Sequence, residues 1–246
     1  GTYGPNQRYF DECRQSTSNN KLTNEVYMRV ATEYGSSKAE KLHIFRSENG
    51  GEYQLIDMID GNDNSYTDEN LEFGYTYSYV VQVSENGVYS AYSEPASVTL
   101  ALPEGLAPKN FTWYWAKDTG NHLVWEMEDY NIHPTYTVER KASGEDNYQV
   151  IATGVTGRTY DDTSAQANTQ YSYRVQGVFK GAKTGYGEIS GYNPLTVQAP
   201  SGSLSADGKG FTVNKPVISG GSGDYTISYY LYDNSFKLYG ACPYDG

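Results

Sequence analysis

The chain has few of the residues from which cross-linked or metal-binding centres are built. Its 246 residues include 2 cysteines and 3 histidines. Cys13 and Cys242 lie near opposite ends of the sequence and neither has a CxxC neighbour, which excludes the disulfide framework of small secreted domains. His43, His122 and His133 are scattered without the spacing of metal ligands. The sequence therefore predicts no metal site and no cofactor.

Long apolar runs and basic charge are also scarce. No window holds the roughly 18 apolar residues that a membrane-spanning helix needs, so we expect no direct membrane insertion of this segment. Lys and Arg number 18 against 30 Asp and Glu, which gives a formal net charge of -12. This surplus of carboxylates repels phosphate groups and therefore argues against nucleic acid and anionic membrane surfaces as partners.

Catalytic signatures are missing as well. The sequence has no Gly-x-Ser-x-Gly elbow, no Walker-type loop and no histidine placed as a base beside a nucleophile. The acidic pair Asp161 and Asp162 fits a solvated face better than an acid-base pair. The segment Asp60 to Glu69, "DGNDNSYTDE", carries oxygen ligands suited to calcium, but turn chemistry explains it equally well. We expect no catalytic residues and no enzyme.

Tyrosine and glycine are abundant, at 26 residues each. Tyrosine favours half-buried strands and glycine favours turns. In "YTYSYVVQV", from Tyr75 to Val83, aromatic and apolar residues share one parity, which is the two-residue period of a strand. Runs of this kind alternate with turns rich in Gly, Asn and Asp at the short spacing of antiparallel sandwiches. The sequence predicts an all-β protein.

An internal repeat organises the chain. The stretch from Ser65 to Val83 resembles the stretch from Thr159 to Val178, and the residues that coincide are separated by 94 positions (160 − 66 = 94). The tyrosines that coincide are Tyr66 with Tyr160, Tyr77 with Tyr171 and Tyr79 with Tyr173. A second block, from Ile44 to Ile56, matches Val138 to Ile151. We infer two copies of one unit of about 95 residues.

Both units resemble fibronectin type III domains. The second unit carries the motifs most fully, in "HLVWEM" with Trp125, in "YTVERK" and in the pattern T-x-Y-x-Y-x-V. The resemblance implies two immunoglobulin-like β-sandwiches in tandem. It also implies that Tyr77 and Tyr171 are tyrosine-corner residues, whose hydroxyl groups bond to the backbone a few residues upstream. In the first unit, Val30 or Ala31 stands where the core tryptophan is expected.

Boundaries follow from composition and length. We predict fibronectin type III domains at residues 1–101 and 102–199, joined by the proline-containing linker "ALPEGLAPKN", which two prolines stiffen. Residues 200–246 are too few for a complete sandwich and are predicted as a partial third β-domain. Within this tail we expect two strands around a glycine-rich turn at residues 219–225, similar to repeats of bacterial surface proteins.

The aromatic run "FTWYWAK" supplies the candidate ligand contacts. On a strand, Trp113 and Trp115 point to one face and Tyr114 to the other. Flat aromatic rings match the apolar faces of sugars, which would make Trp113, Tyr114 and Trp115 a carbohydrate platform. In the second interpretation the tryptophan face packs into the sandwich core or against a neighbouring domain. The sequence leaves both open.

A second aromatic run, "YSAYS" from Tyr89 to Ser93, resembles the Trp-Ser box of cytokine receptors. The preceding strand has no arginine for a cation-π ladder, and the second copy loses the spacing. We therefore interpret the run as a turn and an early strand whose serines cap the local backbone. No Arg-Gly-Asp triplet is present, so integrin-style recognition has no support.

The resemblance favours a non-catalytic spacer or adhesion region of a larger secreted or cell-surface protein, of bacterial type. Such a region is extracellular or at the cell surface and binds a protein or a glycan there. The alternative is a set of carbohydrate-binding accessory modules on an exported glycan-degrading enzyme. A cytokine-type receptor is disfavoured, because its disulfides are absent and the box lies in the first unit.

Overall fold

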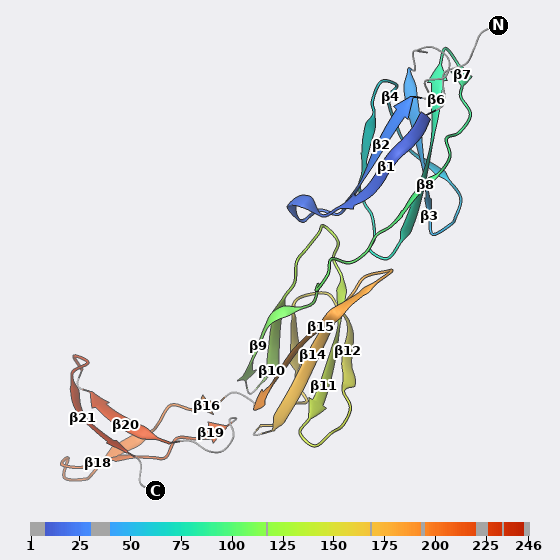
Figure 1. The fold of residues 1–246 in the computed structure, drawn as a ribbon. Coiled ribbons are helices and arrows are strands. Elements are labelled where there is room, and N and C mark those ends of the chain that lie inside the picture. Colours follow the sequence, from blue (N-terminus) through green and yellow to red (C-terminus); the bar gives the residue numbers. More distant parts are fainter. Residues whose placement is uncertain are drawn as a thin grey trace. The chain divides into compact units, whose positions relative to one another are not determined.

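The computed structural model describes residues 8–30, 40–116, 118–167, 169–192, 195–219, 226–232 and 234–243. Strands and turns make up almost all of these ranges, and the helical element within them is a single 3-10 turn, η1 (Ser18–Asn20). Figure 1 shows the strands in chain order.

The first sandwich is built from two antiparallel sheets. Its strands are β1 (Arg8–Ser16), β2 (Thr23–Val30), β3 (Lys41–Glu48), β4 (Gln54–Asp60), β5 (Ser65–Asp68), β6 (Thr76–Glu85), β7 (Val88–Tyr89) and β8 (Ala96–Thr99). One sheet has the order β1-β2-β5. The other has the order β4-β3-β6-β7, and β8 also pairs with β6.

The second sandwich repeats this order. Its strands are β9 (Lys109–Ala116), β10 (Gly120–Glu126), β11 (Thr135–Ala142), β12 (Gln149–Val155), β13 (Thr159–Asp162), β14 (Gln170–Val178) and β15 (Lys183–Tyr192). The sheets have the orders β9-β10-β13 and β12-β11-β14-β15. The duplicated topology confirms the predicted fold class of two tandem immunoglobulin-like sandwiches.

The two-residue period of the strands places apolar side chains between the sheets. On β6, Tyr77, Tyr79, Val81 and Val83 are almost completely buried, at 0 or 1% exposure. Their neighbours on β6 alternate to the outer face, as the pleat of a strand requires. The apolar core that the sequence predicted from parity therefore exists in this strand.

The core tryptophan of the second sandwich has a methionine as its counterpart. Trp125 lies four positions after Asn121, and Met28 lies four positions after the equivalent Asn24; both side chains are buried. The expectation that Val30 or Ala31 stands here was wrong, and Ala31 lies outside the described residues. The first copy has three more residues between β2 and β3, so the 94-residue offset does not hold in β2.

The last strand of the two sandwiches differs. In the second sandwich β15 is continuous for ten residues, whereas in the first sandwich residues 90–95 separate β7 from β8. Both β7 and β8 pair with β6. The first sandwich therefore has an irregular segment along its edge, which carries part of the "YSAYS" run.

The tail forms three two-stranded sheets. Its strands are β16 (Thr196–Val197), β17 (Gly202–Leu204), β18 (Phe211–Val213), β19 (Ile218–Ser219), β20 (Ser228–Tyr232) and β21 (Leu238–Pro243). The pairs are β16-β19, β17-β18 and β20-β21. The predicted hairpin around residues 219–225 was wrong, because β19 and β20 pair with other strands; residues 220–225 themselves lie outside the described ranges.

The tail pairing begins at Thr196, before the predicted boundary at 199/200. By its contacts the chain divides into two units, residues 1–108 with 127–136 and 176–186, and residues 109–126 with 137–175 and 187–246. Three strands of the second sandwich, β11, β14 and β15, cross this division. We therefore describe each sandwich by its own strands, and the boundaries at 101/102 and 199/200 stay predictions.

Candidate functional site

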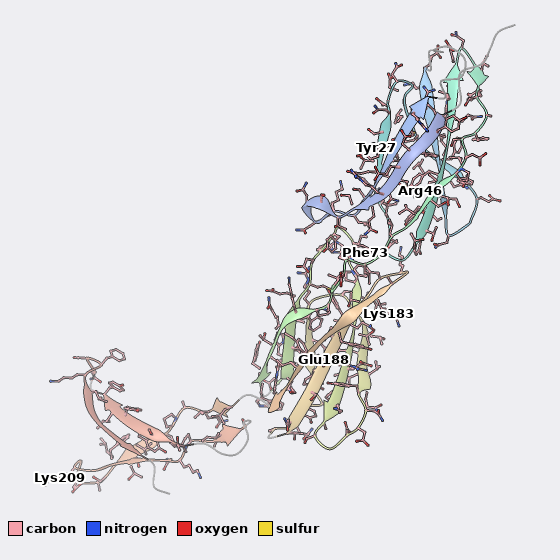
Figure 2. The ribbon with its side chains drawn as sticks, viewed as in Figure 1. Tyr27, Arg46, Phe73, Lys183, Glu188 and Lys209 are labelled. Atoms are coloured by element: carbon pink, nitrogen blue, oxygen red, sulfur yellow. The ribbon has the colours of Figure 1, made fainter. Side chains whose placement is uncertain are left out.

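A buried polar network lies inside the first sandwich. Asn24 Nδ2 donates a hydrogen bond to the Tyr79 hydroxyl at 2.9 Å, and that hydroxyl donates to Asp68 Oδ2 at 2.5 Å. Arg46, labelled on β3 in Figure 2, donates from one guanidinium nitrogen to both Asp68 carboxylate oxygens at 3.0 Å. Four polar side chains from β2, β3, β5 and β6 are thus joined in one hydrogen-bonded network, in which Asn24 Oδ1 is the buried atom left without a partner in the described part of the chain.

The second sandwich contains the same network. Asn121 Nδ2 donates to the Tyr173 hydroxyl at 2.8 Å, and Tyr173 donates to Asp162 Oδ2 at 2.7 Å. Arg140 donates to the same Asp162 oxygen at 2.8 Å, and Ser164 Oγ donates to the other oxygen at 2.7 Å. The repeat in the sequence therefore includes the buried hydrogen-bonded side chains of the two sandwiches.

The electrostatics of this network oppose acid-base catalysis near neutral pH. Burial, reinforced by the hydrogen bond to the adjacent carboxylate, raises the pKa of Tyr79 and of Tyr173 far above the ordinary tyrosine value. Burial alone would also raise the pKa of Asp162, but hydrogen bonds from Ser164, Arg140 and Tyr173 outweigh it and lower that pKa. Groups whose charge is fixed at pH 7 support the fold and cannot exchange protons readily.

The predicted tyrosine-corner residues lie beside these networks. The Tyr77 hydroxyl oxygen accepts a hydrogen bond from the Glu72 backbone N–H at 2.8 Å, and the Tyr171 hydroxyl accepts one from the Gln166 N–H at 2.9 Å. Each acceptor bond reaches back five residues. Burial raises the pKa of Tyr77 to about 12, so the hydroxyl stays neutral. The structural role of Tyr77 and Tyr171 stays a prediction.

The aromatic strand β9 turns its two tryptophans inward. Trp113 is half-buried, and its ring centroid lies 6.3 Å from that of the core residue Tyr173. Trp115 is also half-buried and shares the parity of Trp113. The two indole rings therefore do not lie on the outer face of the sheet, and the predicted carbohydrate platform finds no support in their placement.

Tyr114 lies on the outer face, at 54% exposure, in a row that crosses three strands. His122 pairs in register with Tyr114 on one side and with Asp161 on the other. The Tyr114 and His122 ring centroids are 4.8 Å apart, and His122 Nδ1 is hydrogen-bonded to Asp161 Oδ1. Sequence reasoning missed this row, although the parity of "GNHLVWE" around His122 is the signal that could have found it.

The candidate calcium segment forms a turn. Asp60 Oδ1 accepts hydrogen bonds from the Asn62 backbone N–H at 2.8 Å and from its side chain at 3.2 Å. Within the described ranges, no group of three or more His, Cys, Asp or Glu side chains has the geometry to hold a metal ion. The same part of the chain contains no helix with the length and apolarity to cross a bilayer.

The "YSAYS" serines cap the backbone of β6, as the sequence predicted. Ser90 Oγ accepts a hydrogen bond from the Val83 N–H at 2.9 Å, and Ser93 Oγ accepts one from the Val81 N–H at 2.9 Å. Tyr89 and Tyr92 point outward instead, at 57 and 52% exposure. The serines therefore support the fold, whereas the tyrosines belong to the surface.

Comparisons with models of protein families and with curated protein sequences give no match. Among solved structures, a two-domain fibronectin type III segment of chicken tenascin is similar at 12% identity, over 74% of this chain and 97% of that chain, with a TM-score of 0.44. The FN1–FN3 domains of chicken CNTN1 are similar at 15% identity, over 98% of this chain and 85% of that chain, with a TM-score of 0.37. The strand order and the buried network, each present twice, identify the two complete sandwiches of this chain as tandem modules of the fibronectin type III fold.

Proposed function

We propose that this chain is a non-catalytic, modular interaction region of an extracellular or cell-surface protein. The sandwiches act as supports that present binding surfaces and space them along the chain. The observation that carries the proposal is that Asn, Tyr, Asp and Arg form the same buried network in both sandwiches, while the outer faces of the two sandwiches differ. A retained interior with divergent surfaces is typical of modules that differ in what they bind.

The chemistry of the interior supports the non-catalytic part of the proposal. Tyr79 and Tyr173, whose pKa values are raised most, are buried, and each donates a hydrogen bond to an aspartate of its own sandwich. A catalytic acid or base needs contact with a substrate and a pKa near the working pH. The accessory carbohydrate-binding alternative has no support from Trp113 and Trp115, because both face inward.

Two measurements on the whole chain test this function. The first screens it against an array of extracellular matrix and cell-surface proteins, and we expect saturable binding that excess soluble chain displaces. The second measures turnover of chromogenic glycoside, ester and phosphate substrates, and we expect none. Turnover that Asp162→Asn or His122→Ala abolishes would contradict the non-catalytic assignment, and an array without any saturable binding would contradict the interaction role.

A further inference from the structure

Part of the outer face of the sheet β4-β3-β6-β7 is apolar, beside the polar pairs Lys41 with Ser84 and His43 with Gln82 on the same face. The solvent side of an antiparallel sheet is ordinarily polar, because it faces water. Here it presents six side chains that we call the apolar face: Phe45, Tyr53, Leu55, Val80, Tyr89 and Tyr92. Tyr53, Leu55, Tyr89 and Tyr92 are 41, 50, 57 and 52% exposed, whereas Phe45 is half-buried and Val80 is buried. Contiguous exposed apolar groups of this kind mark interaction sites more often than isolated ones.

The apolar face is hollowed at its centre. Phe45, Tyr53, Val80 and Tyr92 line a depression of about 420 Å³. The rings of Phe45 and Tyr92 meet edge to face, with centroids 5.5 Å apart. Among the residues that the structure describes, no charged side chain lines the depression. A depression of this size, open to solvent and walled by apolar groups, fits one aromatic or branched apolar side chain of a partner.

The second sandwich shows that the fold does not require this face. At the offset of 94 positions, Phe45 corresponds to Glu139 and Val80 to Arg174. Glu139 and Arg174 form an ion pair, and the Arg174 guanidinium lies 4.3 Å from the Tyr148 ring centroid. The same sheet of the same fold is therefore stable with a charged pair where the first sandwich has an apolar pair.

A change in the supporting backbone does not explain the difference. Gln82 Nε2 donates to the Ser90 carbonyl oxygen at 3.1 Å, and Gln176 Nε2 donates to the Thr184 carbonyl oxygen at 2.8 Å. Ser90 and Thr184 each also cap a backbone N–H of the neighbouring strand. On this shared support the first sandwich places Tyr89, and the second places Lys183, which is labelled on β15 in Figure 2.

The tyrosines of the apolar face are held in place before any partner binds. Tyr92 lies between Ser90 and Ser93, and the side chains of both serines are fixed to β6 by hydrogen bonds of 2.9 Å. The Tyr89 ring also packs on His43, with centroids 5.5 Å apart. Side chains that are already ordered lose little entropy on binding, which favours their use as contacts.

The charge around the apolar face selects the partner. Glu52 comes directly before Tyr53 and Glu94 two positions after Tyr92, and neither has an ion pair within the part of the chain that the structure describes. Lys41 is the basic residue at the start of β3. Residues 1–100 hold 7 basic and 15 acidic residues (7 − 15 = −8), against 8 and 11 in residues 101–200 (8 − 11 = −3). A second copy of this acidic sandwich would be repelled, whereas a basic segment would be attracted.

We propose that the apolar face docks a basic segment of a partner protein. An aromatic or branched apolar side chain of that segment enters the depression between Phe45 and Tyr92. Lysine or arginine residues on either side of this anchor meet Glu52 and Glu94. This inference rests on the proposed function, since it names the surface and the partner class of one module of the interaction region.

The test uses the whole chain and a variant that the fold already tolerates in its second copy. Phe45→Glu with Val80→Arg places in the first sandwich the pair that Glu139 and Arg174 form in the second. Peptides are selected from a random library displayed on phage. We expect selected peptides to share an apolar anchor flanked by Lys or Arg. A synthetic representative should bind the double variant about tenfold more weakly or worse, and bind more weakly as salt rises.

Two further variants serve as controls for specificity and for folding. Tyr114→Ala removes an exposed aromatic ring from the second sandwich and should leave binding unchanged. If the double variant lowers the unfolding midpoint, Tyr92→Ser repeats the test, because this ring is 52% exposed and its loss should leave the fold intact. Retained binding in a folded Tyr92→Ser or double variant would overturn the proposal.

The remaining outcomes separate this inference from the proposed function. Selected peptides that are acidic or lack an apolar anchor overturn the inference. Binding that maps to Tyr114 or to the tail also overturns it, but the interaction role survives. If the chain binds a glycan array and the double variant does not, the proposal of a protein partner is wrong and the apolar face is a sugar-binding site. If the chain associates with itself and the double variant does not, the inference is also wrong, and the apolar face binds a second copy of the chain.

Discussion

At the scale of single residues, the most informative feature is a carboxylate that is almost completely enclosed. The Asp162 side chain is 3% exposed, and burying an unpaired charge to this degree would cost several kcal/mol. Arg140, Tyr173 and Ser164 together offset that cost with three hydrogen bonds. Each of these partners is a strand or corner residue, so the network ties the two sheets together only when the sandwich is folded.

The depressed pKa of Asp162 predicts a pH dependence of stability. A carboxyl whose pKa is lower in the folded state contributes stability above its unfolded pKa of about 4 and loses it as pH falls through the folded pKa. We expect Asp162→Asn to lower the free energy of unfolding at pH 7 by roughly 2–4 kcal/mol. The difference between the variant and the parent chain should shrink as the pH falls below about 4.

Urea unfolding at a series of pH values measures this effect. Asp146→Asn is the matched control, because Asp146 is exposed and no hydrogen bond or ion pair is recorded for it in the described part of the chain. An Asp162→Asn difference that stays constant between pH 7 and low pH would mean that the carboxylate charge contributes nothing.

The tyrosine-corner prediction is tested by removing one oxygen atom. Tyr171→Phe keeps the ring but leaves the Gln166 N–H without the acceptor that lies 2.9 Å away. We expect the free energy of unfolding of the second sandwich to fall by about 1–2 kcal/mol. Tyr114→Phe removes a hydroxyl from an exposed ring and should change stability by less than about 0.5 kcal/mol. Equal effects of the two variants in chemical denaturation would refute the structural role of Tyr171.

At the scale of elements, the sequence predicted the strands that have a strict two-residue period. It did not always predict which residue occupies a given core position in a strand. The parity of Tyr77, Tyr79, Val81 and Val83 indicated both the strand and its buried face, since alternation is a local property of the backbone. Met28 was missed because its position depends on the length of the connection between β2 and β3. Insertions in loops leave the pleat unchanged but shift any alignment made at a fixed offset.

Strand partners in the tail were also beyond local reasoning. Alternation around residues 219–225 indicates two strands, but it carries no information on which strands pair, and β19 and β20 pair with β16 and β21. The orientation of β9 was left open for a related reason. Period-two parity separates Trp113 from Tyr114 but does not say which face meets the second sheet.

The irregular edge between β7 and β8 provides a test at this scale. Ser93 Oγ is the acceptor for the buried Val81 N–H at 2.9 Å, in place of a regular strand partner. Ser93→Ala should lower the free energy of unfolding of the first sandwich by about 1–3 kcal/mol and speed hydrogen exchange at the Val81 amide. Ser97→Ala, at an exposed position of β8, is the control. Unchanged exchange at Val81 would show that the serine cap is dispensable.

At the scale of the whole molecule, the chain contains two interiors of the same design and a tail without one. The buried networks of the sandwiches share no residue, since one uses Asn24, Arg46, Asp68 and Tyr79 and the other uses the equivalents on β10, β11, β13 and β14. Among the residues of 195–243 whose side chains the structure describes, which leave out 196, 220–225, 233, 239 and 241–243, none is buried. Burial of apolar area is the main source of cooperative stability, so cooperative unfolding should come from residues before the tail.

The predicted boundary at 101/102 makes unfolding of the full chain separable by mutation. Tyr79→Phe removes the donor to Asp68, and Tyr173→Phe removes the donor to Asp162, at equivalent buried positions. We expect each variant to lower the unfolding midpoint of its own sandwich, with a loss of about 1–3 kcal/mol, and to leave hydrogen-exchange protection in the other sandwich unchanged. If each substitution lowered hydrogen-exchange protection on both β6 and β14, the two sandwiches would unfold as one cooperative unit. The boundary at 101/102 would then not separate two independently folding domains.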